Sequence, residues 1–182
     1  GPSSQTRTPI LDLGGCRRGK SRHALDLAAG YLGYRNLFIS TCVPADKEKS
    51  MRVARNQSER GKAWSTLEIP IRLAETITAE STRADVILVD CLTLWMSNLI
   101  VETGGEQDEI DPFVGHLTHA LTEAQCPVIL VSNEVGAGIV PDNALARRYR
   151  DAAGWMNQAV AGIADRVIHT VAGIPVVIKK DR

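Results

Sequence analysis

The sequence has no long hydrophobic run and no excess of charge of either sign. Its 21 Lys and Arg residues balance 21 Asp and Glu residues, so the formal net charge at pH 7 is zero. A neutral surface argues against binding of nucleic acid or an anionic membrane by overall attraction, although it leaves room for local basic clusters. No stretch approaches the ~18 uninterrupted apolar residues of a membrane-spanning helix, so no span is expected.

Closely spaced cysteines are also missing. The four cysteines, Cys16, Cys42, Cys91 and Cys126, form no C-x-x-C pair, and each lies in or beside an apolar run. This pattern suits reduced thiols better than a disulfide framework, so we expect a cytoplasmic protein. No apolar segment follows Gly1-Pro2-Ser3-Ser4, which we interpret as a cloning remnant and not a signal peptide.

What the sequence does contain is an alternation of short apolar runs with longer helical segments. The clearest runs, Val86–Val89 and Pro127–Val131, are almost continuously apolar, as in strands buried on both faces. This alternation predicts an α/β fold with a mostly parallel central sheet and helices on both faces. The last two strands, joined across Ala172-Gly173, are expected to form a hairpin at one edge. The length predicts one domain, residues 10–182, after an N-terminal tail, residues 1–9.

Apolar positions near the 3.6-residue spacing predict four helices. Their expected ranges are Ser21–Ala29, Ile71–Glu80, Phe113–Glu123 and Asn143–Ile163. The acidic segment Glu102–Asp111 is predicted to be a surface loop.

The most informative stretch is a phosphate-loop motif. Gly14-Gly15-Cys16-Arg17-Arg18-Gly19-Lys20-Ser21 fits G-x-x-x-x-G-K-[ST], follows a predicted strand and opens a predicted helix. Glycines let backbone N–H groups turn toward phosphate oxygens, and the helix start adds its positive end. We expect a P-loop NTPase-like three-layer fold in which Lys20 reaches the β- and γ-phosphates. The alternative is a glycine-rich turn without a ligand, and Arg17 and Arg18 either contact phosphate or are solvated.

A magnesium site is predicted beside this loop. Asp90 directly follows the strand Val86–Val89, as expected of a Walker-B aspartate, and the Ser21 hydroxyl would be the second protein ligand of Mg²⁺. The alternative role for Asp90 is to cap the helix that starts near Leu92. Together these residues predict binding of ATP or GTP with Mg²⁺, without deciding between the two bases.

Further motifs carry a family resemblance. The stretch Ser132-Asn133-Glu134-Val135-Gly136-Ala137-Gly138-Ile139-Val140-Pro141, with Arg150-Asp151 and Asn157-Gln158 after it, is far more specific than the phosphate loop. Together with Asp90-Cys91-Leu92-Thr93, it strongly resembles the adenosylcobinamide kinase/adenosylcobinamide-phosphate guanylyltransferase family of cobalamin biosynthesis. The resemblance runs from about Ile10 to Lys179.

The resemblance implies two activities. The kinase step phosphorylates the aminopropanol hydroxyl of adenosylcobinamide, and the second step passes GMP from GTP through a covalent histidine intermediate onto that phosphate. It also implies a corrinoid substrate and a homo-oligomer, in the family a ring-like trimer. The family's Thr-x-Glu matches Thr66 to Glu68, which implies guanine-nucleotide binding by Glu68. The alternative for Glu68 is an exposed charge at a strand end. Thr41 matches a nucleotide-contacting stretch.

One position departs from the family. The family helix with the pattern Arg-Ile-x-x-His-x-x-x-Arg-x-x-x-Trp matches Arg52 to Trp64 here, and Arg52, Arg60 and Trp64 keep the register. The position of the guanylylated histidine is occupied by Asn56. A carboxamide nitrogen has a delocalised lone pair and cannot replace a nucleophilic imidazole. The basic segment that contains Arg60 is either a solvated helix face or a phosphate-binding surface.

Three hypotheses follow. The first is an adenosylcobinamide kinase-like enzyme whose guanylyltransferase step is lost or impaired, with Lys20, Ser21 and Asp90 as catalytic residues. The second is a diverged, non-catalytic protein that binds nucleotide or corrinoid as a sensor or complex partner. The third is the full bifunctional enzyme with another guanylyl acceptor. Asp90 and Glu134 are the candidates for orienting the acceptor hydroxyl.

Overall fold

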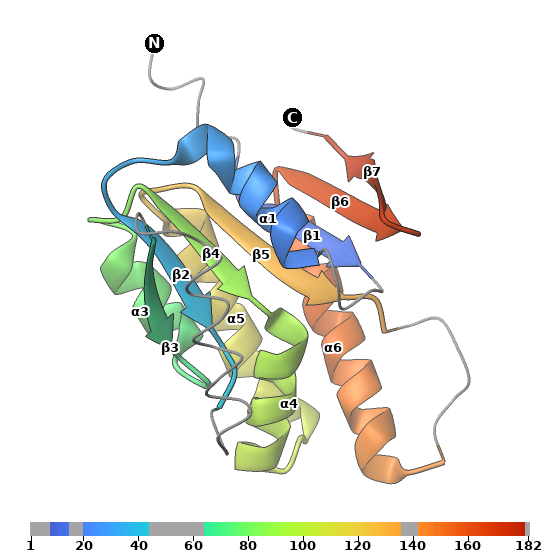
Figure 1. Cartoon of the computed structure of the whole chain (residues 1–182). Helices are drawn as coiled ribbons and strands as arrows, with labels where there is room; N and C mark the ends of the chain where they lie inside the picture. Colours follow the sequence, from blue (N-terminus) through green and yellow to red (C-terminus); the bar gives the residue numbers. More distant parts are fainter. Residues whose placement is uncertain (1–7, 15–19, 44–63, 136–141, 181–182) are drawn as a thin grey trace.

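A computed structural model of the chain describes residues 8–14, 20–43, 64–135 and 142–180. Its strands form one seven-stranded sheet in the order β3-β2-β4-β5-β1-β6-β7 (Figure 1). The strands are β1 (Ile10–Gly14), β2 (Asn36–Ser40), β3 (Trp64–Glu68), β4 (Val86–Asp90), β5 (Val128–Asn133), β6 (Arg166–Val171) and β7 (Ile174–Lys179).

Helices connect the strands. They are α1 (Lys20–Ala28), the short 3-10 helix η2 (Ala29–Tyr31), α3 (Leu73–Glu80), α4 (Leu92–Thr103), α5 (Gln107–Glu123) and α6 (Ala144–Ile163). Among the described residues, no helix combines the length and the apolar character needed to cross a membrane.

The expected sheet architecture is confirmed. Every pair of neighbouring strands is parallel except β6 with β7, which are antiparallel. The turn between these two strands consists of Ala172 (φ 51°) and Gly173 (φ 78°). Two consecutive residues with positive φ are the backbone geometry of a tight two-residue hairpin, so the C-terminal edge hairpin is present as expected.

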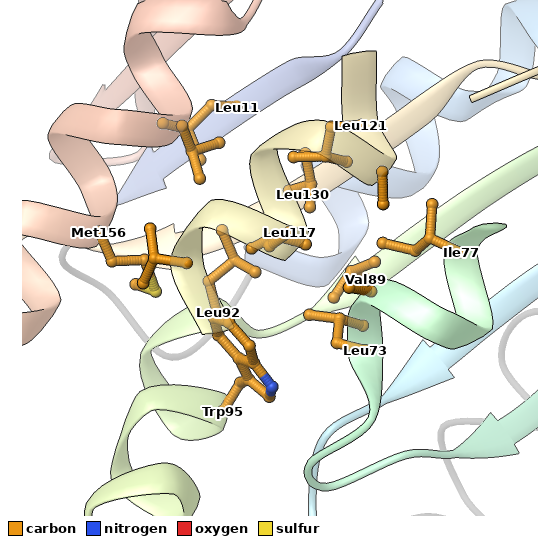
Figure 2. Packing of buried hydrophobic residues seen from close by; sticks show 14 of the residues in the cluster. Leu11, Leu73, Ile77, Val89, Leu92, Trp95, Leu117, Leu121, Leu130 and Met156 are labelled. Atoms are coloured by element: carbon orange, nitrogen blue, oxygen red, sulfur yellow. The ribbon is translucent and has the colours of Figure 1, made fainter. Parts of the chain in front are cut away.

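The two faces of the sheet are covered unequally. On one face, side chains of alternate strand residues pack against α3, α4, α5 and α6 in one large apolar cluster. Figure 2 shows part of it, with Trp95 of α4 and Met156 of α6 beside Leu117 of α5. On the other face, α1 is the one described helix in the core cluster, which it joins through Ala24 and Ala28. Alanine lets a helix lie close to the sheet, and α1 lies against β5 and β4.

The segment Glu102–Asp111 is not a surface loop, and that expectation is wrong. Glu102 lies in the last turn of α4, which ends at Gly104 with a left-handed φ of 95°. The residues from Gln107 onward form the first turn of α5. Asp108 and Glu109 lie in that first turn, where a helix N-terminus stabilises negative charge. The acidic composition therefore marks a helix start.

Both ends of α6 have partners for their backbone groups. At its start, the Asn143 side chain accepts a hydrogen bond from the backbone N–H of Leu145 at 2.8 Å. At its end, Lys179 Nζ donates to the carbonyl oxygens of Ala161 at 2.9 Å and Gly162 at 3.1 Å. An ammonium group at a helix C-terminus satisfies unpaired carbonyls and favours the helix dipole. This contact fastens the last strand to α6.

Candidate functional site

The described part of the predicted site lies along one edge of the sheet. Gly14 ends β1 and is in register with Asn133, the last residue of β5. Asp90 ends β4 and is in register with Ser40, the last residue of β2. Glu68 ends β3 opposite Ser40. In parallel α/β sheets, ligands bind beyond the carboxyl ends of the strands, which is where these residues are gathered.

Several predicted site residues lie outside the described residues. These are Gly15, Cys16, Arg17, Arg18, Gly19, Asn56 and Arg60. Lys20 and Ser21 are the first two residues of α1, so the end of the motif does open a helix, as expected.

Asp90 lies two strands away from the phosphate-loop strand. The sheet order places β5 between β4 and β1. Two strand spacings of ~4.8 Å separate Asp90 from Gly14 laterally by about 10 Å. The alternative role of Asp90 as a helix cap is wrong, because the N-cap of α4 is Cys91, without a side-chain capping bond. The Asp90 side chain is half-buried.

Magnesium fits this arrangement. In the described residues no group of three or more His, Cys, Asp or Glu side chains could hold a metal ion. Mg²⁺ needs no such cage, because it binds one or two protein oxygens together with substrate phosphates and water. Asp90 places a carboxylate, a ligand type that Mg²⁺ accepts, at the end of the sheet where the phosphate-loop motif starts. The role of Ser21 as the second protein ligand stays a prediction, because its side chain is outside the part that the structure describes.

Thr41 is a buried support for the backbone around Asp90. Its N–H donates to the Asp90 carbonyl at 3.1 Å. Its hydroxyl donates to the Cys91 carbonyl at 2.8 Å and accepts from the Cys91 N–H at 3.0 Å. The side chain is 0% exposed. Thr41 thus fixes the chain as it leaves β4, while a direct contact of Thr41 with nucleotide stays a prediction.

A polar network that was not predicted from the sequence joins the end of β5 to α4 and α6. The Asn133 amide donates to the Thr93 hydroxyl at 3.2 Å, and the Asn157 amide donates to the Asn133 carbonyl at 2.9 Å. The Ser132 hydroxyl donates to the Asn157 side-chain oxygen at 2.6 Å. Ser132, Asn157 and Thr93 are buried. Buried polar groups linked in this way hold one geometry, so the end of β5 is fixed relative to α4 and α6.

Tyr149 of α6 extends this network. Burial raises the pKa of its phenol, and the neighbouring Cys91 raises it further, while a side-chain hydrogen bond with Thr93 acts in the opposite direction. Tyr149 also lines a hollow of about 260 Å³ between α4 and α6. The other lining residues are Ser97, Ile100, Val101, Asn143, Leu145 and Ala146. A mostly apolar hollow therefore adjoins the polar edge of the sheet.

A buried carboxylate lies under the start of α1. Asp12, in the middle of β1, is 0% exposed, and its Oδ2 is 3.0 Å from Nδ1 of His23. The Thr170 hydroxyl of β6 donates to Asp12 Oδ1 at 3.4 Å. This pair was not predicted from the sequence. The charged residue inside the otherwise apolar run Ile10–Leu13 is the signal that could have indicated it.

Two candidates stand apart from this edge network. Glu68 is exposed at the end of β3, and Glu134 is exposed just beyond β5. A larger groove of about 640 Å³ lies between α3 and α5, lined in part by Phe113, His116 and His119. None of the predicted nucleotide-site residues lines it.

Comparison with known families decides what kind of protein has this site. A family model described as "Cobinamide kinase / cobinamide phosphate guanyltransferase" matches residues 10–178. The chain belongs to this family. The resemblance inferred from the sequence motifs is thereby confirmed, and with it the link to cobalamin biosynthesis and to P-loop nucleotide binding.

Curated relatives are similar over nearly their whole length. The bifunctional adenosylcobalamin biosynthesis protein CobP of Pseudomonas aeruginosa is 43% identical over 169 residues, covering 93% of this chain and 96% of the relative. The corresponding CobU protein of Salmonella typhimurium is 40% identical over 181 residues, covering 93% and 99%. That of Escherichia coli is 37% identical, with the same coverage.

Solved structures share the fold at much lower identity. The flagellar accessory protein FlaH of Methanocaldococcus jannaschii superposes with a TM-score of 0.54 at 15% identity, covering 94% of this chain and 78% of that one. A Pyrococcus horikoshii protein gives 0.53 at 9% identity, covering 98% and 89%. The α/β, P-loop NTPase-like fold expected from the sequence is confirmed.

Proposed function

We propose that the protein is a nucleoside-triphosphate-dependent kinase that phosphorylates the aminopropanol hydroxyl of cobinamide, and that its guanylyltransferase step is lost or impaired. One observation carries the kinase part. In a chain of this family, the phosphate-loop motif leaves the carboxyl end of β1 at the same sheet edge that carries Asp90.

Phosphoryl transfer needs positioning and charge neutralisation more than it needs a nucleophilic side chain. In the proposal, Lys20 binds the β- and γ-phosphates, and Ser21 with Asp90 holds Mg²⁺, which when bound offsets phosphate charge. The half-buried Asp90 is fixed from behind by Thr41. Asp90 or the exposed Glu134 orients the acceptor hydroxyl.

We place the acceptor at the hollow between α4 and α6. Its lining is mostly apolar, which suits contact with one apolar edge of a corrinoid, since a hollow of about 260 Å³ is too small to enclose the whole ring system. Tyr149 lines the hollow and is linked through Thr93 to Asn133 at the end of β5. A substrate held there would have its hydroxyl directed toward the polar edge of the sheet.

The proposed loss of guanylyl transfer rests on Asn56. In the family pattern, this position carries the histidine that becomes guanylylated. Asn56 lies outside the described residues, so the proposal stands on the sequence match and on the chemistry of a carboxamide. The bifunctional alternative would need another acceptor, and none of the chain's four histidines, His23, His116, His119 and His169, lies at this position.

Isotope transfer separates the hypotheses. The protein is incubated with Mg²⁺, adenosylcobinamide and γ-³²P-ATP or γ-³²P-GTP, and separately with α-³²P-GTP alone. We expect label on cobinamide in the first reaction and none on denatured protein in the second. Nucleotide binding without cobinamide phosphorylation would contradict the kinase and favour a binding protein. Label retained on the denatured protein would contradict the loss of guanylyl transfer.

A substitution sharpens the second outcome. Asn56→His restores the nucleophile, and we expect it to gain α-³²P label if the surrounding guanine-nucleotide site, including Glu68 and Arg60, is retained. Asn56→Gln is the matched control, because it keeps a carboxamide and should gain none.

We further propose a homo-oligomer, a trimer as the family resemblance implies. The β6–β7 hairpin supports this, because β7 is the edge of the described sheet and its apolar side chains are exposed, with Ile174 at 64% and Ile178 at 59%. Exposed apolar edge strands are typical interaction sites. Sedimentation velocity should show a trimer for the wild type and a smaller species for Ile178→Lys. A monomeric wild type would contradict the proposal.

A further inference from the structure

We propose that the Asp12–His23 pair is a clasp that positions the phosphate loop for triphosphate binding. The inference rests on the proposed nucleotide-binding function and assigns two residues to it that the motif does not include. His23 and Asp12 act as positioning residues in this proposal, through the backbone that they join.

Asp12 and His23 flank the phosphate-loop motif in the sequence. Asp12 comes two residues before Gly14, where the motif begins, and His23 comes two residues after Ser21, where it ends. The contact of 3.0 Å between Asp12 Oδ2 and His23 Nδ1 joins residues 11 positions apart. A carboxylate only accepts hydrogen bonds, so the His23 Nδ1–H is the donor. The bond therefore ties β1 to the first turn of α1 across the two ends of the motif.

The chemistry of the pair is costly for a purely structural role. Asp12 is 0% exposed, while the neighbouring Ile10, Leu11 and Leu13 are apolar core residues. Burying a carboxylate is unfavourable unless it is paired, and an apolar residue of similar volume is often neutral or more stable there. We therefore infer that the Asp12–His23 pair contributes more by fixing the position of α1 relative to β1 than by stabilising the core.

A second contact orients the Asp12 carboxylate. The Thr170 hydroxyl of β6 donates to Asp12 Oδ1 at 3.4 Å, so the two carboxylate oxygens are bonded from different elements. His23 is 21% exposed on its side chain, and Asp12 is fully enclosed. The imidazole therefore reaches inward from α1 to a carboxylate that β6 already orients.

Holding the two ends of a loop in place lowers the entropy that ligand binding must remove. The backbone N–H groups of a phosphate loop bind phosphate oxygens only at the correct mutual spacing. Loss of the clasp should therefore weaken the binding of triphosphates and leave binding of the base and ribose unchanged.

The test uses three variants that break the pair: Asp12→Val, His23→Leu and the double variant of these two. They are compared with His23→Asn, which keeps a side-chain N–H donor near the position of Nδ1. Dissociation constants are measured by calorimetry for a non-hydrolysable ATP or GTP analogue with Mg²⁺ and for the corresponding nucleoside. His116→Leu is the matched control, since His116 is an exposed histidine on α5.

We expect each single variant to bind the triphosphate about tenfold more weakly, as loss of a charge-assisted hydrogen bond implies. The nucleoside constant should not change, His23→Asn should recover most of the affinity, and the double variant should be no worse than either single one. Thr170→Val, which keeps the pair, should weaken triphosphate binding about twofold.

Unchanged triphosphate affinity in folded variants would overturn the clasp, as would equal weakening of triphosphate and nucleoside or additive losses in the double variant. If Asp12→Val does not fold, the comparison of His23→Leu with His23→Asn decides. A wild-type protein that binds no triphosphate would contradict the proposed function itself, and one that binds without transferring phosphate still permits this test.

Discussion

The two faces of the sheet have different chemistry. The face under α3 to α6 is packed with large apolar side chains such as Trp95, Leu117 and Met156 (Figure 2). The face under α1 uses Ala24 and Ala28 for contact, and the bond between α1 and β1 is made by the buried Asp12–His23 pair. The first face supplies most of the buried apolar area, while the second holds the helix that the phosphate-loop motif opens. We therefore expect substitutions on the first face to change stability alone, and substitutions on the second to change nucleotide affinity as well.

The largest expected effect is on the stability of the four-helix face. Trp95 is 1% exposed, and its Nε1 donates to the Ile71 carbonyl at 2.8 Å. Trp95→Ala should lower the free energy of unfolding by about 3–5 kcal/mol, because it leaves a cavity and an unpaired carbonyl. Urea denaturation measures this loss. Triphosphate affinity of the remaining folded protein should stay at the wild-type value; a parallel loss of affinity would break the distinction between the faces.

The opposite pattern is expected at the sheet edge. Asp90→Asn keeps the size of a half-buried side chain and removes the charge proposed to hold Mg²⁺. We expect the rate of phosphoryl transfer to fall about a hundredfold, equivalent to about 2.7 kcal/mol. The free energy of unfolding without Mg²⁺ should change by less than about 1 kcal/mol. A full rate of cobinamide phosphorylation in this variant would remove Asp90 from the proposed site.

A matched pair of smaller changes compares the faces directly. Ala24 of α1 is 0% exposed, and Ala120 of α5 is 3% exposed on the other face. Replacement of either by Val overpacks its contact and should cost about 1–3 kcal/mol of stability. Only Ala24→Val should also weaken triphosphate binding, by about tenfold, because it displaces α1, which the phosphate-loop motif opens, from β4 and β5. Equal affinities in the two variants would show that α1 tolerates displacement.

The smallest effect is a difference in thiol reactivity. Burial raises the pKa of the Cys126 thiol to about 12, with a further contribution from Asp85. A raised pKa keeps the thiol protonated at pH 8, and only the thiolate is reactive. Cys126 should therefore resist iodoacetamide at that pH, and it should react in urea. Peptide mass spectrometry checks this, and rapid labelling of Cys126 in the native protein would indicate that the face beneath α3 and α5 opens.

Much of this arrangement was predictable from local patterns. The runs Val86–Val89 and Pro127–Val131 are buried strands because both of their faces are covered, and their composition reflects that. The predicted start of α5 was wrong because charged residues such as Asp108 are typical of loops. The helix dipole also stabilises them in a first helical turn, and the prediction did not consider this effect.

The side-chain partners of the site could not be predicted in the same way. Asp12 meets a residue 158 positions away, Thr170, and Asn133 meets Thr93 from a different strand–helix unit. Such contacts depend on the strand order, which no local periodicity specifies. The phosphate-loop motif is recognisable because its spacing is entirely local, whereas the clasp around it depends on how β1, β6 and α1 come together.

Because β5 lies between β4 and β1, the sheet fixes the distance between Asp90 and the start of the phosphate loop. Asp90 is level with Asp12 through Val131, so the gap between Asp90 and Gly14 is two strand spacings across the sheet and two residues along β1. Backbone hydrogen bonds set this gap. Insertions or exchanges in the connecting segments should therefore leave this gap unchanged as long as the three strands remain paired. In protein engineering, the connecting segments could therefore be exchanged to change the acceptor specificity. Strand pairing would keep the proposed metal ligand Asp90 at the same distance from the start of the phosphate loop.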